Sequence, residues 1–170
     1  MFKKALFAAI FFSIALTNSA SANCDLSVAN FQKLAQNDLD TLYTYNSFNL
    51  KKPILVVSNQ KGLNYYAEQL GSVITIYPKS FNDAYCDQYF DGLTPAVAEA
   101  VSHEYVHYLD GKLDLSKKIG EQHFSENTAE LGEHVFDTLI WHTGFYTEKS
   151  SQSAQRKFDI LLAKISKPLQ

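Results

Sequence analysis

Two histidines stand four residues apart in the run His103-Glu104-Tyr105-Val106-His107. In an α-helix, residues at this spacing differ by about 40° in azimuth and about 6 Å in height, so both imidazoles can reach one point. Zn²⁺ binds imidazole nitrogens at about 2.0–2.1 Å and needs such convergence. Glu104 flanks the same face of the helix, where its carboxylate can bond a water molecule beside the metal. The run therefore predicts a site for one zinc ion per chain, with a carboxylate base next to it.

A third metal ligand is available in the segment Ser125-Glu126-Asn127-Thr128-Ala129-Glu130. Glu126 and Glu130 are again four residues apart, so both project from one face of the predicted helix. One can complete a set of three protein ligands, and the other can accept a hydrogen bond from the far nitrogen of a zinc-bound histidine. Spacing alone does not assign the two roles, and Glu133 and His134 compete for them.

The H-E-x-x-H pattern is typical of zinc metallopeptidases, in which the glutamate acts as general base. Three protein ligands leave one zinc position for water, and Glu104 then takes the proton as hydroxide attacks a peptide carbonyl. His142 and Tyr146 are weak candidates, by residue type, to donate to the oxyanion. The strand at 73–77 is expected to offer the sheet edge along which an extended peptide pairs.

A non-catalytic alternative is a zinc-stabilised binding or structural module of the cell envelope. Such a module needs the zinc ligands but no general base. The presence of Glu104 favours the enzyme, with a peptide or protein as its substrate.

The run from His103 to Lys112, His-Glu-Tyr-Val-His-Tyr-Leu-Asp-Gly-Lys, resembles the zinc helix of bacterial collagenases, which are gluzincin metallopeptidases. The downstream Glu-x-x-Ala-Glu element of that family is matched from Glu126 to Glu130, and the likeness covers roughly residues 53–135. The resemblance implies that Glu126 is the third zinc ligand and that Glu130 is the hydrogen-bond partner of a zinc histidine. Since the collagenases are much longer, with activator and matrix-binding domains, it implies zinc peptidase chemistry rather than collagen as the substrate.

The first 22 residues have the pattern of a secretory signal peptide. Lys3 and Lys4 precede an apolar run at 5–16, which ends in small residues and an Ala20-x-Ala22 site. The apolar run is too short to anchor the protein across a bilayer. We therefore expect export to the periplasm or beyond, with no membrane span after cleavage. The net charge of −3 and the absence of a basic cluster exclude a nucleic-acid partner.

Cys24 and Cys86 are the two cysteines of the chain. An even cysteine count in an exported protein favours a disulfide, which here would pin the start of the mature chain to the body. Two free buried thiols are the alternative.

The surrounding pattern predicts one α+β domain at 23–170, a minimal zincin-like unit in which a small sheet is followed by packed helices that carry the zinc site. Apolar spacing and turn residues predict helices at 25–45, 62–70, 94–109, 125–143 and 153–165, strands at 54–57 and 72–77, and a loop at 79–93. Thr94 is the expected cap of the zinc helix, and Asp110-Gly111 is its expected end.

Overall fold

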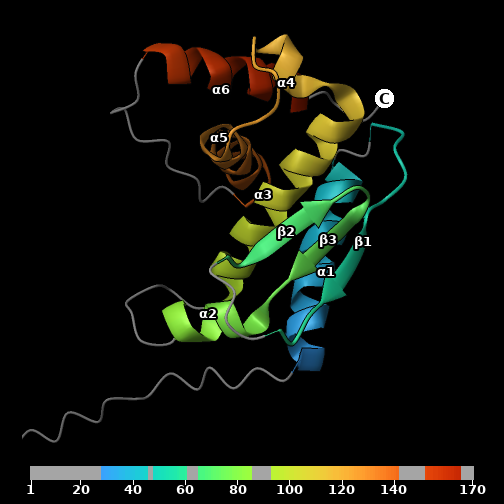
Figure 1. Ribbon diagram of the computed structural model, residues 1–170. Helices are drawn as coiled ribbons and strands as arrows, with labels where there is room; N and C mark the ends of the chain where they lie inside the picture. The colour runs from blue at the N-terminus through green and yellow to red at the C-terminus, as the bar shows by residue number, and fades with distance from the viewer. Residues whose placement is uncertain (1–27, 46–47, 61–64, 86–92, 142–151, 166–170) are drawn as a thin grey trace, which may run out of the picture.

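The computed structural model describes residues 28–45, 48–60, 65–85, 93–141 and 152–165. These residues form helices and a three-stranded sheet (Figure 1), which confirms the predicted α+β class. The elements are α1 (Val28–Tyr45), β1 (Ile54–Val57), β2 (Ala67–Leu70), β3 (Val73–Ile76), α2 (Pro78–Tyr85), α3 (Leu93–Leu113), α4 (Leu115–Lys118), α5 (Glu126–Phe136), the π-helical turn η1 (Asp137–Trp141) and α6 (Gln152–Ile165).

The strand order of the sheet is β1-β3-β2. β1 runs parallel to β3, and β2 runs antiparallel to it with Leu70 opposite Val73. The hairpin between β2 and β3 turns at Gly71-Ser72, where Gly71 has a φ of 62°. That conformation suits glycine at the first central position of a two-residue hairpin loop. β3 is therefore the central strand, and β2 lies at one edge.

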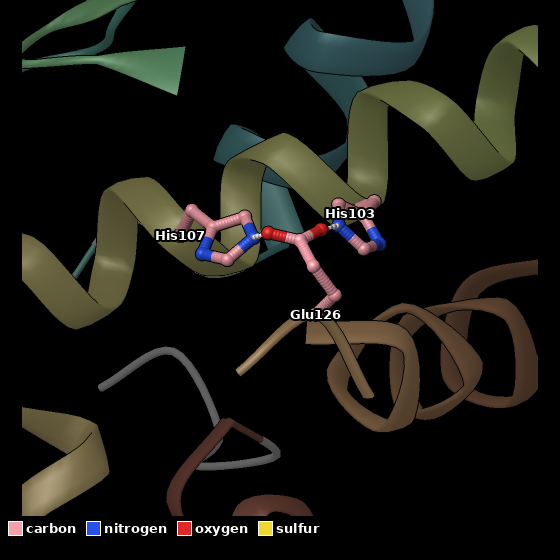
Figure 2. Close-up of side chains that lie close together, drawn as sticks. All are labelled: His103, His107 and Glu126. Atoms are coloured by element: carbon pink, nitrogen blue, oxygen red, sulfur yellow. Dashed lines mark hydrogen bonds and ion pairs between the residues drawn. The ribbon is translucent and has the colours of Figure 1, made fainter. Parts of the chain in front are cut away.

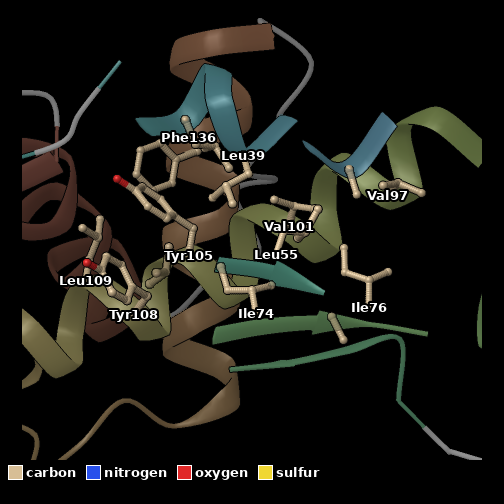
Figure 3. Packing of buried hydrophobic residues seen from close by; sticks show 14 of the residues in the cluster. Leu39, Leu55, Ile74, Ile76, Val97, Val101, Tyr105, Tyr108, Leu109 and Phe136 are labelled. Atoms are coloured by element: carbon tan, nitrogen blue, oxygen red, sulfur yellow. The ribbon is translucent and has the colours of Figure 1, made fainter. Parts of the chain in front are cut away.

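Helices α1 and α3 pack on one face of the sheet (Figure 1). Alternate strand residues point into this layer, so Leu55, Ile74 and Ile76 are buried against α3 residues such as Val101 (Figure 3). On the other face of β1, Ile54 is 59% exposed. The core thus lies between the sheet and α3, which fixes the orientation of the zinc helix predicted from the sequence.

Helix α5 crosses α3 at very close range. A Cβ built on Gly132 of α5 would lie 2.6 Å from a methyl carbon of Val106, so only glycine fits there without movement. Helix α6 covers the far side of α5 and buries Leu161 and Ile165. Lys157 of α6 also forms an ion pair with Glu121, in the loop before α5. These contacts hold α5, and the acidic residues on it, against α3.

The helix predicted at 62–70 is wrong over its described part. Residues Ala67–Leu70 form the strand β2, because the turn at Gly71 brings them alongside β3. The local sequence contains helix-favouring residues, but pairing with the neighbouring strand prevails over that preference. The loop predicted at 79–93 is also partly wrong, since Pro78–Tyr85 form helix α2, with Phe81 buried against Phe31.

The ends of α3 differ from those predicted. The helix begins at Leu93, one residue before the expected cap Thr94, and runs through Gly111 to Leu113. The backbone N–H of Asp114 still donates to the carbonyl of Asp110 at 2.9 Å, and Asp114 itself takes the left-handed conformation that ends the helix. Packing around the last turn, including partly buried Leu113, outweighs the weak helix preference of Gly111.

Several predicted features lie outside the described residues: the signal segment at 1–22, Cys24 and Cys86 with their disulfide, and the oxyanion candidates His142 and Tyr146. Of the helices that are described, none combines the length and hydrophobicity needed to cross a bilayer.

Candidate metal centre

The structure brings together the three predicted zinc ligands. His103 and His107 lie in the middle of α3, with ring centroids 5.0 Å apart, and Glu126 is the first residue of α5. The carboxylate of Glu126 points between the two imidazoles (Figure 2). Its Oε2 lies 3.1 Å from Nε2 of His103, and its Oε1 lies 3.7 Å from Nε2 of His107. One donor atom from each of the three residues falls within 4.8 Å of the others.

These separations suit a tetrahedral zinc ion. Ligand bonds of about 2.0–2.1 Å at the tetrahedral angle place donor atoms roughly 3.3 Å apart. The contacts of 3.1 and 3.7 Å, each made by a different oxygen of Glu126, lie near that separation. Two imidazole nitrogens and one carboxylate oxygen also match the donor types of catalytic zinc sites. The residues present therefore fit a zinc ion, and Glu126, which is exposed, leaves the site open to solvent.

The local fold determines where Glu126 lies. Ser125 caps α5 by accepting a hydrogen bond from the backbone N–H of Thr128, so the helix begins at Glu126. Asp110, one turn after His107, holds the connecting loop: its carboxylate accepts from the backbone N–H of Ser116 at 2.6 Å and from that of Phe124 at 3.4 Å. Helix α3 thereby fixes the loop that brings Glu126, the third candidate ligand, to the two histidines.

The partner of the far nitrogen of His103 is Glu133 rather than Glu130. Oε2 of Glu133 lies 3.2 Å from Nδ1 of His103, and the Glu133 side chain is largely buried. Glu130 is exposed and lines the same cleft, without a hydrogen bond to either histidine among those described. Seven residues make nearly two full helical turns, so Glu133 lies on the same face as Glu126. The sequence left Glu133 open as a competitor for this role, and its seven-residue spacing from Glu126 is the local signal that favours it.

The contacts of His103 restrict the protonation states that its imidazole ring can have. A neutral imidazole has only one N–H donor, yet both ring nitrogens of His103 face carboxylate oxygens. Either the ring is charged, or one of the two carboxyl groups is protonated and donates to it, or a cation lies between Nε2 and Glu126. Burial disfavours the charged ring, but the carboxylates of Glu133, Glu104 and Glu126 together raise the pKa of His103. Burial and the neighbouring charge of His103 lower the pKa of His107.

Glu104 occupies the position expected of a base beside the metal. Its side chain is buried, and burial raises its pKa to about 7, against the favourable effect of His103. The charges of Glu126 and Glu68 raise this pKa further, whereas a hydrogen bond with the backbone of Gln69 lowers it. Glu104 therefore sits between the ligand cluster and strand β2, and it is easily protonated near neutral pH.

A cleft runs along the ligands. Beside Glu126 it is lined by Glu104, His107 and residues of β2, including Glu68 and Gln69. It continues past Glu126 to residues of α3 and α5. The edge strand at this cleft is β2, not the predicted segment 73–77. β3 is paired on both sides, so its backbone groups are already used, whereas the outer edge of β2 has no strand beside it among the described residues.

No protein-family model, curated protein or solved structure matches the chain. The function must therefore be argued from the geometry of the site.

Proposed function

We propose that this chain is an exported zinc-dependent endopeptidase of the gluzincin type. One observation carries the proposal: His103 and His107 converge with Glu126, and the buried Glu104 lies beside them in the same cleft. An ion site without catalysis would need the first three residues only. A buried carboxylate beside that site is suited to act as a general base, and burial raises the pKa of Glu104 to about 7 in the metal-free protein.

Zinc held by His103, His107 and Glu126 would supply Lewis acidity, which polarises a carbonyl group and lowers the pKa of water. The carboxylate of Glu104 then accepts the proton of the attacking water and delivers it to the nitrogen of the leaving amine. Its partly apolar surroundings favour the protonated form after that transfer. Glu133 orients the ring of His103 by accepting from its Nδ1–H, which directs Nε2 toward the ligand cluster.

The outer edge of β2, which has no strand beside it in the described part of the chain, is the proposed place for the substrate backbone. An extended peptide can add to this edge by main-chain hydrogen bonds, which would lay it over Glu104 and the ligand cluster. Main-chain pairing has little sequence preference, so specificity would depend on residues that line the cleft, such as Tyr65.

The test is zinc analysis combined with cleavage of an unbiased peptide library. Wild type should bind zinc at these three residues and cleave internal peptide bonds, and Glu126→Gln should lose both properties. If a His103→Ala variant retains tightly bound zinc at this site, the ligand set is wrong. A fully zinc-loaded wild type that cleaves nothing in a broad library would favour the binding module instead.

A further inference from the structure

A second group of metal-ligating side chains lies behind the first, at the end of α5. Glu133, His134 and Asp137 each place one donor atom within 4.8 Å of the others. Glu133 and Asp137 are four residues apart and share a helix face, and Asp137 begins the π-helical turn η1. This group is distinct from His103, His107 and Glu126, although Glu133 touches both groups through its hydrogen bond to His103.

Asp137 is the residue that needs an explanation. It is only 6% exposed, and no hydrogen bond or ion pair to its side chain is found among the described residues. Buried carboxylates are normally paired with a cation, hydrogen-bonded or bound to a metal, because removing their charge from water is costly. Asp137 instead has carboxylates as its charged neighbours. Burial raises its pKa to about 7, and the charges of Glu133 and Glu99 contribute to this rise.

Glu99 adds a carboxylate from the opposite helix. It lies on α3, one turn before His103, close enough for its charge and that of Glu133 to repel. Among the described residues, no lysine or arginine forms an ion pair with Glu99, Glu133 or Asp137. The imidazoles beside these carboxylates are those of His103, which contacts Glu133, and of His134. Three carboxylates from α3, α5 and η1 thus lie close together, and Asp137 has neither imidazole nor another side chain bonded to it among the described residues.

We propose that Glu133, His134 and Asp137 bind a second divalent metal ion, with Glu99 facing it from α3. Two carboxylates and an imidazole suit a first-row transition ion such as Zn²⁺ or Mn²⁺ better than the all-oxygen sites typical of Ca²⁺. A carboxylate has two oxygens, so Glu133 can accept from His103 with one and bind the second ion with the other. The ion would hold α5 against α3 and keep Glu126 and Glu133 in register with the zinc helix.

The experiment is a Zn²⁺ titration of the metal-free full chain, followed by calorimetry and elemental analysis. Wild type should bind two equivalents, and Asp137→Asn should bind one. In a His107→Ala/Glu126→Gln background, which disables the first group but spares the His103–Glu133 contact, one equivalent should remain and raise the melting temperature. Adding Asp137→Asn to that background should abolish this binding, whereas Glu130→Gln, which removes a carboxylate from the exposed side of the same helix, should not.

One equivalent in wild type that His107→Ala removes and Asp137→Asn leaves in place would overturn this inference, and Asp137 would then be a buried protonated acid. One equivalent that Asp137→Asn removes and His107→Ala leaves would support the second site while contradicting the proposed peptidase. If Asp137→Asn fails to fold, His134→Gln in the wild-type chain replaces it and should also lose one equivalent. Both Zn²⁺ and Mn²⁺ are titrated, so that the choice of metal does not decide the result. If His134→Gln keeps both equivalents of each metal, the inference is again overturned.

Discussion

Replacing Gly132 by alanine tests the close approach of α5 to α3 on which the metal centre depends. The added methyl carbon would lie 2.6 and 2.7 Å from the two methyl carbons of Val106, whereas ordinary contacts begin at 3.4 Å. The helices must therefore separate by about 0.8 Å, or Val106 must move. Overpacking of this kind costs about 1–3 kcal/mol, and the better helix preference of alanine returns at most about 1 kcal/mol. If that return is complete, the net loss in the free energy of unfolding is about 0–2 kcal/mol.

The assay is urea denaturation of the metal-free protein, together with the zinc dissociation constant. Val106 lies one residue before His107, so separating the helices should also move Glu126 away from the histidines and weaken zinc binding. Gly111→Ala is the matched control, because Gly111 is also helical but has open space around it; it should gain up to about 1 kcal/mol. Adding Val106→Ala to Gly132→Ala should restore zinc affinity. If Gly132→Ala is as stable as Gly111→Ala and binds zinc like wild type, the tight interface is wrong.

Three further substitutions test separate parts of the structure. Glu133→Gln should weaken zinc binding about 10–100-fold in a chelator competition assay, because it loses the charged partner of His103, whereas the exposed Glu130→Gln should stay near wild type; equal effects would contradict the assignment. Asp110→Ala should lower the free energy of unfolding by about 1–3 kcal/mol in urea titrations, because two backbone N–H groups of the loop lose their acceptor, and it should also reduce zinc affinity; an unchanged midpoint would refute this role. Asp38 is buried with one oxygen unpartnered, and burial raises its pKa from 3.8 to about 6. Since the folded state then holds this proton more tightly than the unfolded state, stability should fall as the pH rises from about 4 to 6, and Asp38→Asn should remove this loss, gaining up to about 3 kcal/mol at pH 7.5 but little below pH 4. A constant difference between Asp38→Asn and wild type across that pH range would show that burial of charge is not the cause.

The spacing of His103 and His107 was sufficient to predict that the two imidazoles converge, because residues four apart on a helix share a face whatever the tertiary structure. Spacing left Glu126 and Glu130 as alternatives for the third ligand, and the family resemblance favoured Glu126, the residue that lies between the two imidazoles. The strands at 54–57 and 73–76 were likewise predicted, because β-branched runs bounded by turn residues are a strong local signal.

What could not be predicted depends on contacts between distant segments. The strand β2 exists because Ala67–Leu70 pairs with β3, and its sequence alone favoured a helix. The substrate edge was misassigned to 73–77 for the same reason, since strand order is set by tertiary packing. The choice of Glu133 over Glu130 depends on how α5 crosses α3, which Gly132 and Val106 determine.

The most direct test of the proposed peptidase is the Glu104→Gln variant, measured at full zinc loading. Glu104 lines the cleft beside the ligand cluster but is not one of the three converging ligands. The Glu104→Gln variant should therefore fold, bind zinc at wild-type stoichiometry and have the wild-type zinc dissociation constant. General-base catalysis contributes about 10²–10⁴-fold, so cleavage of a peptide that wild type hydrolyses should fall by at least about 100-fold. A zinc-loaded Glu104→Gln protein that cleaves peptides at the wild-type rate would contradict the account.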